Sequence, residues 1–200
     1  ILTLIFTLTV EAKQITAKSF LVTDNKGSVI LEKNADRTQP IASITKLMTA
    51  IIVLNANQDL TEELRLDFKK ANVYHTRLPR TLKTLSRGEL LDLAIVKSDN
   101  FAAYTLCANY PGGVDRCVAE MNHQALESGM YSTHFTDPTG LDESNMSNAR
   151  DLVKLVLVAS RHPESTNASG KPLVSIQVKK KWWDFRNTNS LVRKNSENVI

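Results

Sequence analysis

The stretch that decides the fold is Pro40-Ile41-Ala42-Ser43-Ile44-Thr45-Lys46-Leu47-Met48-Thr49-Ala50. From Ser43 to Asn55, apolar residues lie on nearly every side of a predicted helix, which is typical of a helix buried inside a protein. Ser43 and Lys46 are one helical turn apart, so their side chains share a face and can hydrogen-bond. A serine hydroxyl becomes a nucleophile when a base takes its proton, and burial can lower the pKa of a lysine enough for that role. The pair therefore predicts acyl transfer, and the alternative is a helix-capping Ser43 with a solvated Lys46.

The triplet Ser98-Asp99-Asn100 is the second candidate site segment. It follows a predicted buried helix that begins with the capping-box pattern Ser86-x-x-Glu89. A tight loop after a buried helix can direct polar side chains toward a site. A plain helix-capping loop is the alternative.

The remaining pattern predicts strands at both ends of the chain and helices between them. Runs 19–23 and 28–32 predict a hairpin, and the residues from Lys171 onward predict a return to strands. Residues 60–85 indicate no clear element. Helices are expected at 86–97, 100–109 and 114–128, and from a Ser147 cap to about Ser160. We expect an α/β (α+β) fold, in which one antiparallel sheet lobe is assembled from both ends of the chain beside an all-α lobe.

Composition excludes several classes of function. The chain is 42% hydrophobic and 23% charged, as in ordinary globular proteins, and its formal charge is +4. Its basic residues are spread out except at Lys179–Lys181, so no nucleic-acid partner is expected. The four histidines and two cysteines match no metal-binding motif, and we expect neither a metal nor a cofactor.

Residues 1–14 and the two cysteines bear on export. Residues 1–10 form a short apolar run, and Val10-Glu11-Ala12 resembles a signal-peptidase site, so residues 1–14 predict the remnant of a signal peptide. A buried strand is the alternative. In an exported protein Cys107 and Cys117 can form a disulfide, and two free buried thiols are an equally open interpretation.

Taken together, these motifs resemble low-molecular-mass penicillin-binding proteins of the D-alanyl-D-alanine carboxypeptidase and endopeptidase family. The resemblance rests on the Ser43 segment, on Ser98-Asp99-Asn100 and on four flanking stretches, at 110–113, 135–141, 147–152 and 186–192. It implies a serine β-lactamase/D,D-peptidase-like fold. It also implies that Ser43 attacks a D-Ala peptide carbonyl, Lys46 takes its proton, Ser98 relays that proton to the leaving amine, and Asn100 holds the peptide amide. Peptidoglycan peptides and β-lactam antibiotics are the implied partners, in the periplasm, with peripheral membrane contact as a further expectation.

The third motif of that family, Lys-Thr-Gly, does not occur in the sequence, and Ser169-Gly170-Lys171 has the wrong order. We therefore expect residues 15–200 to form a D,D-peptidase domain without its C-terminal strands, with an incomplete sheet and little turnover. A β-lactamase or esterase of the same fold is one alternative. An inactive, truncated peptidoglycan-binding remnant is the other.

Overall fold

The structure is a computed structural model, and it describes residues 15–24 and 27–194. The predicted signal remnant at residues 1–14 lies outside the described residues.

Eight α-helices and one 3₁₀ helix occur in the described part: η1 (Ala42–Ile44), α1 (Thr45–Asn55), α2 (Ala71–Tyr74), α3 (Arg87–Val96), α4 (Asn100–Ala108), α5 (Gly113–Glu127), α6 (Ala149–Ala159), α7 (Pro163–Gly170) and α8 (Ser190–Arg193). The strands there are β1 (Phe20–Thr23), β2 (Val29–Lys33), β3 (Gln39–Pro40), β4 (Glu63–Arg65), β5 (Thr84–Ser86), β6 (Met146–Ser147), β7 (Leu173–Val178) and β8 (Lys181–Arg186).

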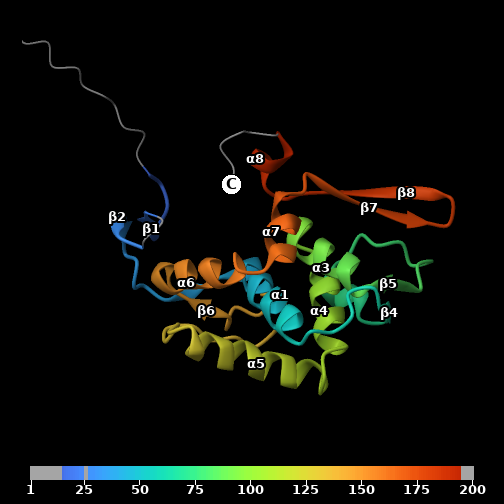
Figure 1. Ribbon diagram of the computed structural model, residues 1–200, viewed down its shortest axis with the longest axis horizontal. Coiled ribbons are helices and arrows are strands. Elements are labelled where there is room, and N and C mark those ends of the chain that lie inside the picture. Colours follow the sequence, from blue (N-terminus) through green and yellow to red (C-terminus); the bar gives the residue numbers. More distant parts are fainter. Residues whose placement is uncertain (1–14, 25–26, 195–200) are drawn as a thin grey trace, which may run out of the picture.

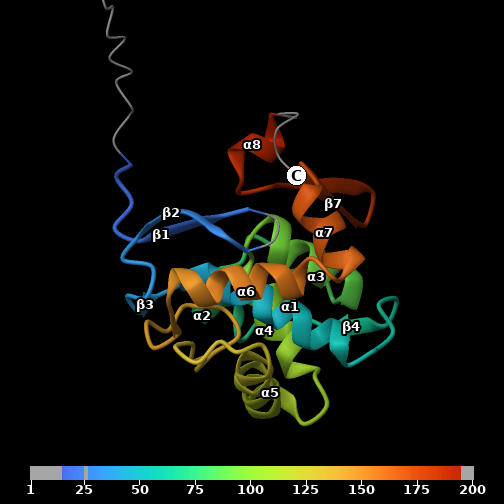
Figure 2. The same ribbon diagram turned by 60° about the vertical axis from the view of Figure 1, so that its left-hand side comes forward.

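Helix α1 is central, with the other long helices around it (Figures 1 and 2). One side, including Ala50 and Val53, joins a core formed with α3, α4 and strand β7. The opposite side, including Met48 and Ile51, joins a second core formed with α5 and α6. Two cores on opposite sides explain why the helix is apolar nearly all round, as predicted.

The predicted helices are confirmed, and the capping residue differs from the prediction in one of them, α6. Ser86 and Glu89 form the expected capping box of α3. Helix α6 is capped by Asn148, whose side chain accepts a 2.8 Å hydrogen bond from the amide of Asp151, and not by Ser147 as predicted. Ser147 instead pairs with Gln39 in the β3–β6 ladder, so its backbone is extended.

The strands form four separate antiparallel pairs within residues 15–24 and 27–194: β1–β2, β3–β6, β4–β5 and β7–β8. The hairpin expected near the N-terminus and the strands expected after Lys171 are confirmed. The two hairpins do not share one sheet there, contrary to our expectation, and they lie well apart in Figure 1. β7 alternates buried and exposed residues because its inner face covers α3, whereas β2 is exposed throughout.

Two features were not expected from the sequence. Helix α7 consists of small and polar residues, but Pro163 at its start favours the first turn, and Ser165 and Ala168 are buried. The unassigned residues 60–85 form the β4–β5 hairpin with the short helix α2 between its strands. Among the described residues, no helix has the length and apolarity needed to cross a membrane.

Candidate active site

Ser43 and Lys46 meet at the start of α1. Ser43 is exposed in η1, and its Oγ lies 3.0 Å from Nζ of Lys46. Lys46 is 2% exposed, so the alternative of a solvated lysine is wrong. Neither η1 nor α1 has a side-chain cap, so Ser43 is not a capping residue.

A loop far along the chain supplies the second partner of Lys46. The carbonyl of Thr139 accepts a 2.6 Å hydrogen bond from Nζ of Lys46. One turn further along α1, Thr49 donates a 2.7 Å hydrogen bond to the carbonyl of Pro138. Helix α1 therefore holds this loop at two successive positions, and the loop in turn fixes the lysine amine.

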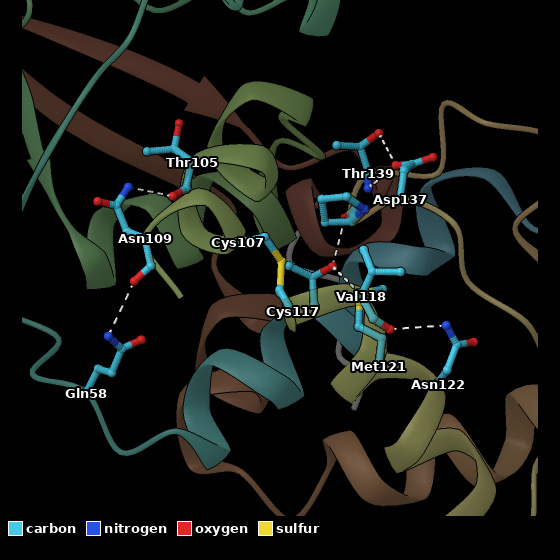
Figure 3. Close-up of a disulfide and its surroundings, with 12 residues drawn as sticks. Gln58, Thr105, Cys107, Asn109, Cys117, Val118, Met121, Asn122, Asp137 and Thr139 are labelled. Carbon is cyan, nitrogen blue, oxygen red and sulfur yellow. Dashed lines mark hydrogen bonds between the residues drawn. A yellow bond between two sulfur atoms is a disulfide. The ribbon is translucent and has the colours of Figure 1, made fainter. Parts of the chain in front are cut away.

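Asp137 organises the same loop. Its Oδ1 accepts hydrogen bonds from the hydroxyl of Thr139 at 2.6 Å and from the amide of Gly140 at 2.9 Å. Its Oδ2 accepts from the amide of Asp142 at 2.8 Å. Figure 3 shows the bond between Asp137 and Thr139. These bonds keep the Thr139 carbonyl aimed at Lys46.

Gly140 is required where the loop meets η1. Its φ is +78°, and a Cβ on it would lie 1.8 Å from the carbonyl oxygen of Ala42. Ala42 itself has a positive φ of 46°, immediately before Ser43. The strained turn that presents Ser43 is therefore packed directly against the backbone of the loop.

Burial lowers the pKa of Lys46 to about 8, while the carboxylates of Asp137 and Asp99 act in the opposite direction. The ammonium form loses hydration inside the protein, and nearby negative charges recover only part of that loss. At pH 8 about half of the Lys46 side chains are then neutral amines, which can accept a proton from Ser43.

The structure places Asp99, the middle residue of the second motif, beside Lys46. Asp99 is 6% exposed, caps α4 through a 2.9 Å bond from the amide of Ala102, and accepts a 2.8 Å bond from the hydroxyl of Thr76. Burial raises its pKa, whereas these two hydrogen bonds and Lys46 lower it. The capping alternative therefore holds for Asp99, and a role of the triplet in the site stays a prediction.

Ser98 and Asn100 flank Asp99 and are half-buried, and Ser98 has a positive φ of 57°. In the part of the chain that the structure describes, neither side chain is hydrogen-bonded to Ser43 or Lys46. The roles of Ser98 in proton relay and of Asn100 in substrate binding stay predictions.

Cys107 and Cys117 form a disulfide, with Cα atoms 5.5 Å apart, so the alternative of two free thiols is wrong (Figure 3). It joins the C-terminal end of α4 to α5, and both cysteines are fully buried. Helix α4 begins at the second motif, so this cross-link secures the helix that carries Asn100 and is capped by Asp99.

Sequence reasoning did not assign roles to Thr139, Asp137 or Thr76. Residues 135–141 supported the family resemblance, but nothing local indicated that their backbone would contact Lys46. Thr76 lies in the stretch 60–85, for which the sequence predicted no element. Among the described residues, no group of three or more His, Cys, Asp or Glu side chains could hold a metal ion.

A buried lysine paired with an exposed serine, on a helix flanked by two cores, fits the class of penicillin-binding proteins that the sequence resembles. The chain belongs to the D-alanyl-D-alanine carboxypeptidase family, whose model matches residues 7–200. This confirms the family and the fold class predicted from the sequence.

Two relatives and one solved structure illustrate the match. The D-alanyl-D-alanine endopeptidases of Pseudomonas aeruginosa and Escherichia coli are each 36% identical to this chain, over 94% and 96% of it. The chain spans 62% and 63% of their lengths. Penicillin-binding protein D2 from Listeria monocytogenes, in its cefotaxime-bound form, is 31% identical, with a TM-score of 0.74 over 90% of this chain and 76% of that one.

Proposed function

We propose that the protein is a serine-type D-alanyl-D-alanine endopeptidase or carboxypeptidase that acts on peptidoglycan peptides through an acyl-enzyme on Ser43. The observation that carries this proposal is the 3.0 Å contact between Ser43 Oγ and the buried amine of Lys46. The 36% identity to two D-alanyl-D-alanine endopeptidases supports the choice of substrate.

The reaction proceeds in two steps. Ser43 Oγ attacks the carbonyl carbon of the D-Ala peptide bond while its proton passes to Lys46, and collapse of the intermediate breaks the C–N bond. The leaving amine receives that proton by way of Ser98, and Asn100 holds the peptide amide. Water then attacks the ester carbonyl and gives up a proton to Lys46. Lys46 passes that proton to Ser43 Oγ as the ester C–O bond breaks, which releases the carboxylic acid product and free Ser43.

β-Lactam antibiotics acylate the same serine in this proposal, and labelling with a fluorescent penicillin tests it. A covalent adduct should appear on the wild type and disappear in Ser43→Ala. Ser160→Ala, at an exposed serine outside the site, is the matched control and should label normally.

Absence of an adduct, or an adduct that survives in Ser43→Ala, would overturn the proposal. Rapid release of the label would favour a β-lactamase or esterase instead. Retention of peptidoglycan without any adduct would favour the non-catalytic binding protein.

We further propose that the protein works in the periplasm, where substrate and antibiotic are accessible. The disulfide supports this, because such bonds persist in oxidising compartments. Intact protein from the periplasmic fraction should gain the mass of two hydrogens on reduction. Its recovery from the cytoplasm in the thiol form would count against export.

A further inference from the structure

The segment from Arg65 to Thr84 is strongly basic. It contains six lysines and arginines and one acidic residue, Asp67, whereas the whole chain carries a formal charge of +4. The remaining residues therefore sum to a slightly negative charge. The expectation that basic residues are spread out except at Lys179–Lys181 is wrong, because the excess positive charge gathers between β4 and β5.

Four of these six basic side chains line one hollow of about 550 Å³ beside the β4–β5 hairpin. Arg65, Lys69, Arg80 and Lys83 line it, together with Asp67, and all five residues are exposed. Asp67 Oδ1 accepts a 3.1 Å hydrogen bond from the backbone amide of Lys69. Within the described residues, Arg65, Lys69 and Lys83 form no ion pair, so their charges face the solvent.

The backbone of residues 65–84, which carries these cations, is anchored to the rest of the protein. The amide of Leu66 donates a 2.9 Å hydrogen bond to the carbonyl of Lys83, which closes the two sides of the hollow. The ring of Phe68 packs on Phe101 of α4, with ring centroids 5.2 Å apart, and Leu78 is 4% exposed. A ligand would therefore meet cations whose backbone is already positioned, which lowers the entropy lost on binding.

We propose that this hollow binds a linear polymer that carries phosphate groups. Guanidinium groups pair with phosphate through two parallel hydrogen bonds, and ammonium groups add point charges. A chain with several phosphates can contact Arg65, Lys69 and Lys83 at once, and each phosphate paired in this way releases the counterions condensed around it. This binding does not involve Ser43 and goes beyond the peptidase function.

A polymer fits the hollow better than a membrane surface does. Anionic lipids would attract the same cations, but a membrane surface is flat on this scale and cannot enter a hollow, whereas a linear chain can. The apolar residues that line the hollow are Leu66, which is buried, and Phe68 and Leu82, which are half-buried. The exposed lining of the hollow is therefore polar, with Arg65, Lys69 and Lys83 among its exposed side chains.

Calorimetric titration with a short linear polyphosphate tests the proposal. The wild type should bind, with an affinity that falls as salt rises. Lys69→Gln/Lys83→Gln should bind about tenfold more weakly at low salt, and the slope of log affinity against log salt should fall by about two, one for each lost contact.

The control is Lys179→Gln/Lys180→Gln, which removes the same charge from the turn between β7 and β8. Equal weakening in both double variants, or no binding by the wild type, would overturn the proposal. Binding only to vesicles that contain phosphatidylglycerol would overturn it in favour of a membrane contact. Penicillin labelling of Ser43 should be unchanged in Lys69→Gln/Lys83→Gln, which separates this site from the proposed peptidase activity.

Discussion

At the scale of single residues, the site depends on a lysine kept in an unfavourable environment. Lys46 is buried, and its pKa is lowered to about 8 mainly by loss of hydration. Placing a charged amine there costs stability at neutral pH, and the same cost supplies a neutral amine for proton transfer. Sites that trade stability for chemistry in this way are common in enzymes.

Lys46→Met should reveal that cost as a pH-dependent gain in stability. Between the folded pKa of about 8 and the ordinary lysine pKa of 10.5, the unfolded chain binds more protons, so the wild type gains stability as pH rises. Methionine does not titrate. The free energy of unfolding is measured in urea for both proteins. The stability advantage of the variant over the wild type should therefore be larger by about 2–3 kcal/mol at pH 7 than at pH 10.

The same substitution at exposed Lys180 is the matched control. A pH dependence of equal size at Lys180 would show that the buried site of Lys46 is not responsible.

Thr76 is a positioning residue for Asp99. Its hydroxyl donates to the buried carboxylate at 2.8 Å, and this bond favours the ionised form. Thr76→Val removes the donor at nearly constant volume and should raise the pKa of Asp99 further, because the ionised carboxylate loses a hydrogen bond. Carboxyl ¹³C NMR across a pH titration measures it. Thr76→Ser keeps the hydroxyl and should leave the pKa in place; equal shifts in both variants would contradict the assignment.

At the scale of elements, the start of α1 and the loop at residues 135–145 act as one unit. Lys46 and Thr49 hold the loop from α1, and Asn145 holds it from its other end by accepting from the amide of Thr136 at 2.6 Å. Gly140 lies so close to Ala42 that a Cβ on it would be 1.8 Å from the Ala42 carbonyl oxygen.

Gly140→Ala should disrupt the contact between the start of α1 and the loop at residues 135–145. The added Cβ would overlap the carbonyl of Ala42, and the positive φ is unfavourable for alanine. Unfolding in urea should show a loss of about 3 kcal/mol or more, and penicillin labelling should fall. Gly170→Ala, where a Cβ meets nothing within 4 Å, is the control and should change stability by about 0.5 kcal/mol or less. Similar losses at both positions would mean that the contact with Ala42 is unimportant.

At the scale of the whole molecule, packing is uneven. Helices α1, α3 and α4 contribute fully buried side chains to the cores, whereas Val29, Ile30 and Leu31 of β2 are 48–66% exposed. Arg150 of α6 ties the N-terminal hairpin to the helices through Glu32 at 2.8 Å and Asp36 at 2.7 Å. Exposed pairs of this kind are screened by water and salt, so they contribute little to stability.

Hydrogen exchange followed by mass spectrometry should therefore resolve two levels of protection. Amides of β1 and β2 should exchange through local opening, and amides of α1 and α4 should exchange close to the global unfolding limit. Equal protection of the hairpin and the helices would contradict this picture.

Local physics explains what the sequence determined. A spacing of three on a helix brings Ser43 and Lys46 together wherever that helix lies, and a capping box such as Ser86 with Glu89 is complete within four residues. The apolar surface of residues 47–54 already required burial on both sides. The helix at 163–170 was missed because its sequence is polar and its stability comes from contacts with α3.

Only the tertiary structure decided the environment of Lys46. Its contacts with the carbonyl of Thr139, 93 residues away, and its proximity to Asp99 depend on how the helices pack. The bond between Thr76 and Asp99, the fit of Gly140 against Ala42 and the gathering of basic side chains around one hollow arise in the same way. Spacing along the chain determines which residues share a helix face, but distances between distant segments follow from the packing of the two cores around α1.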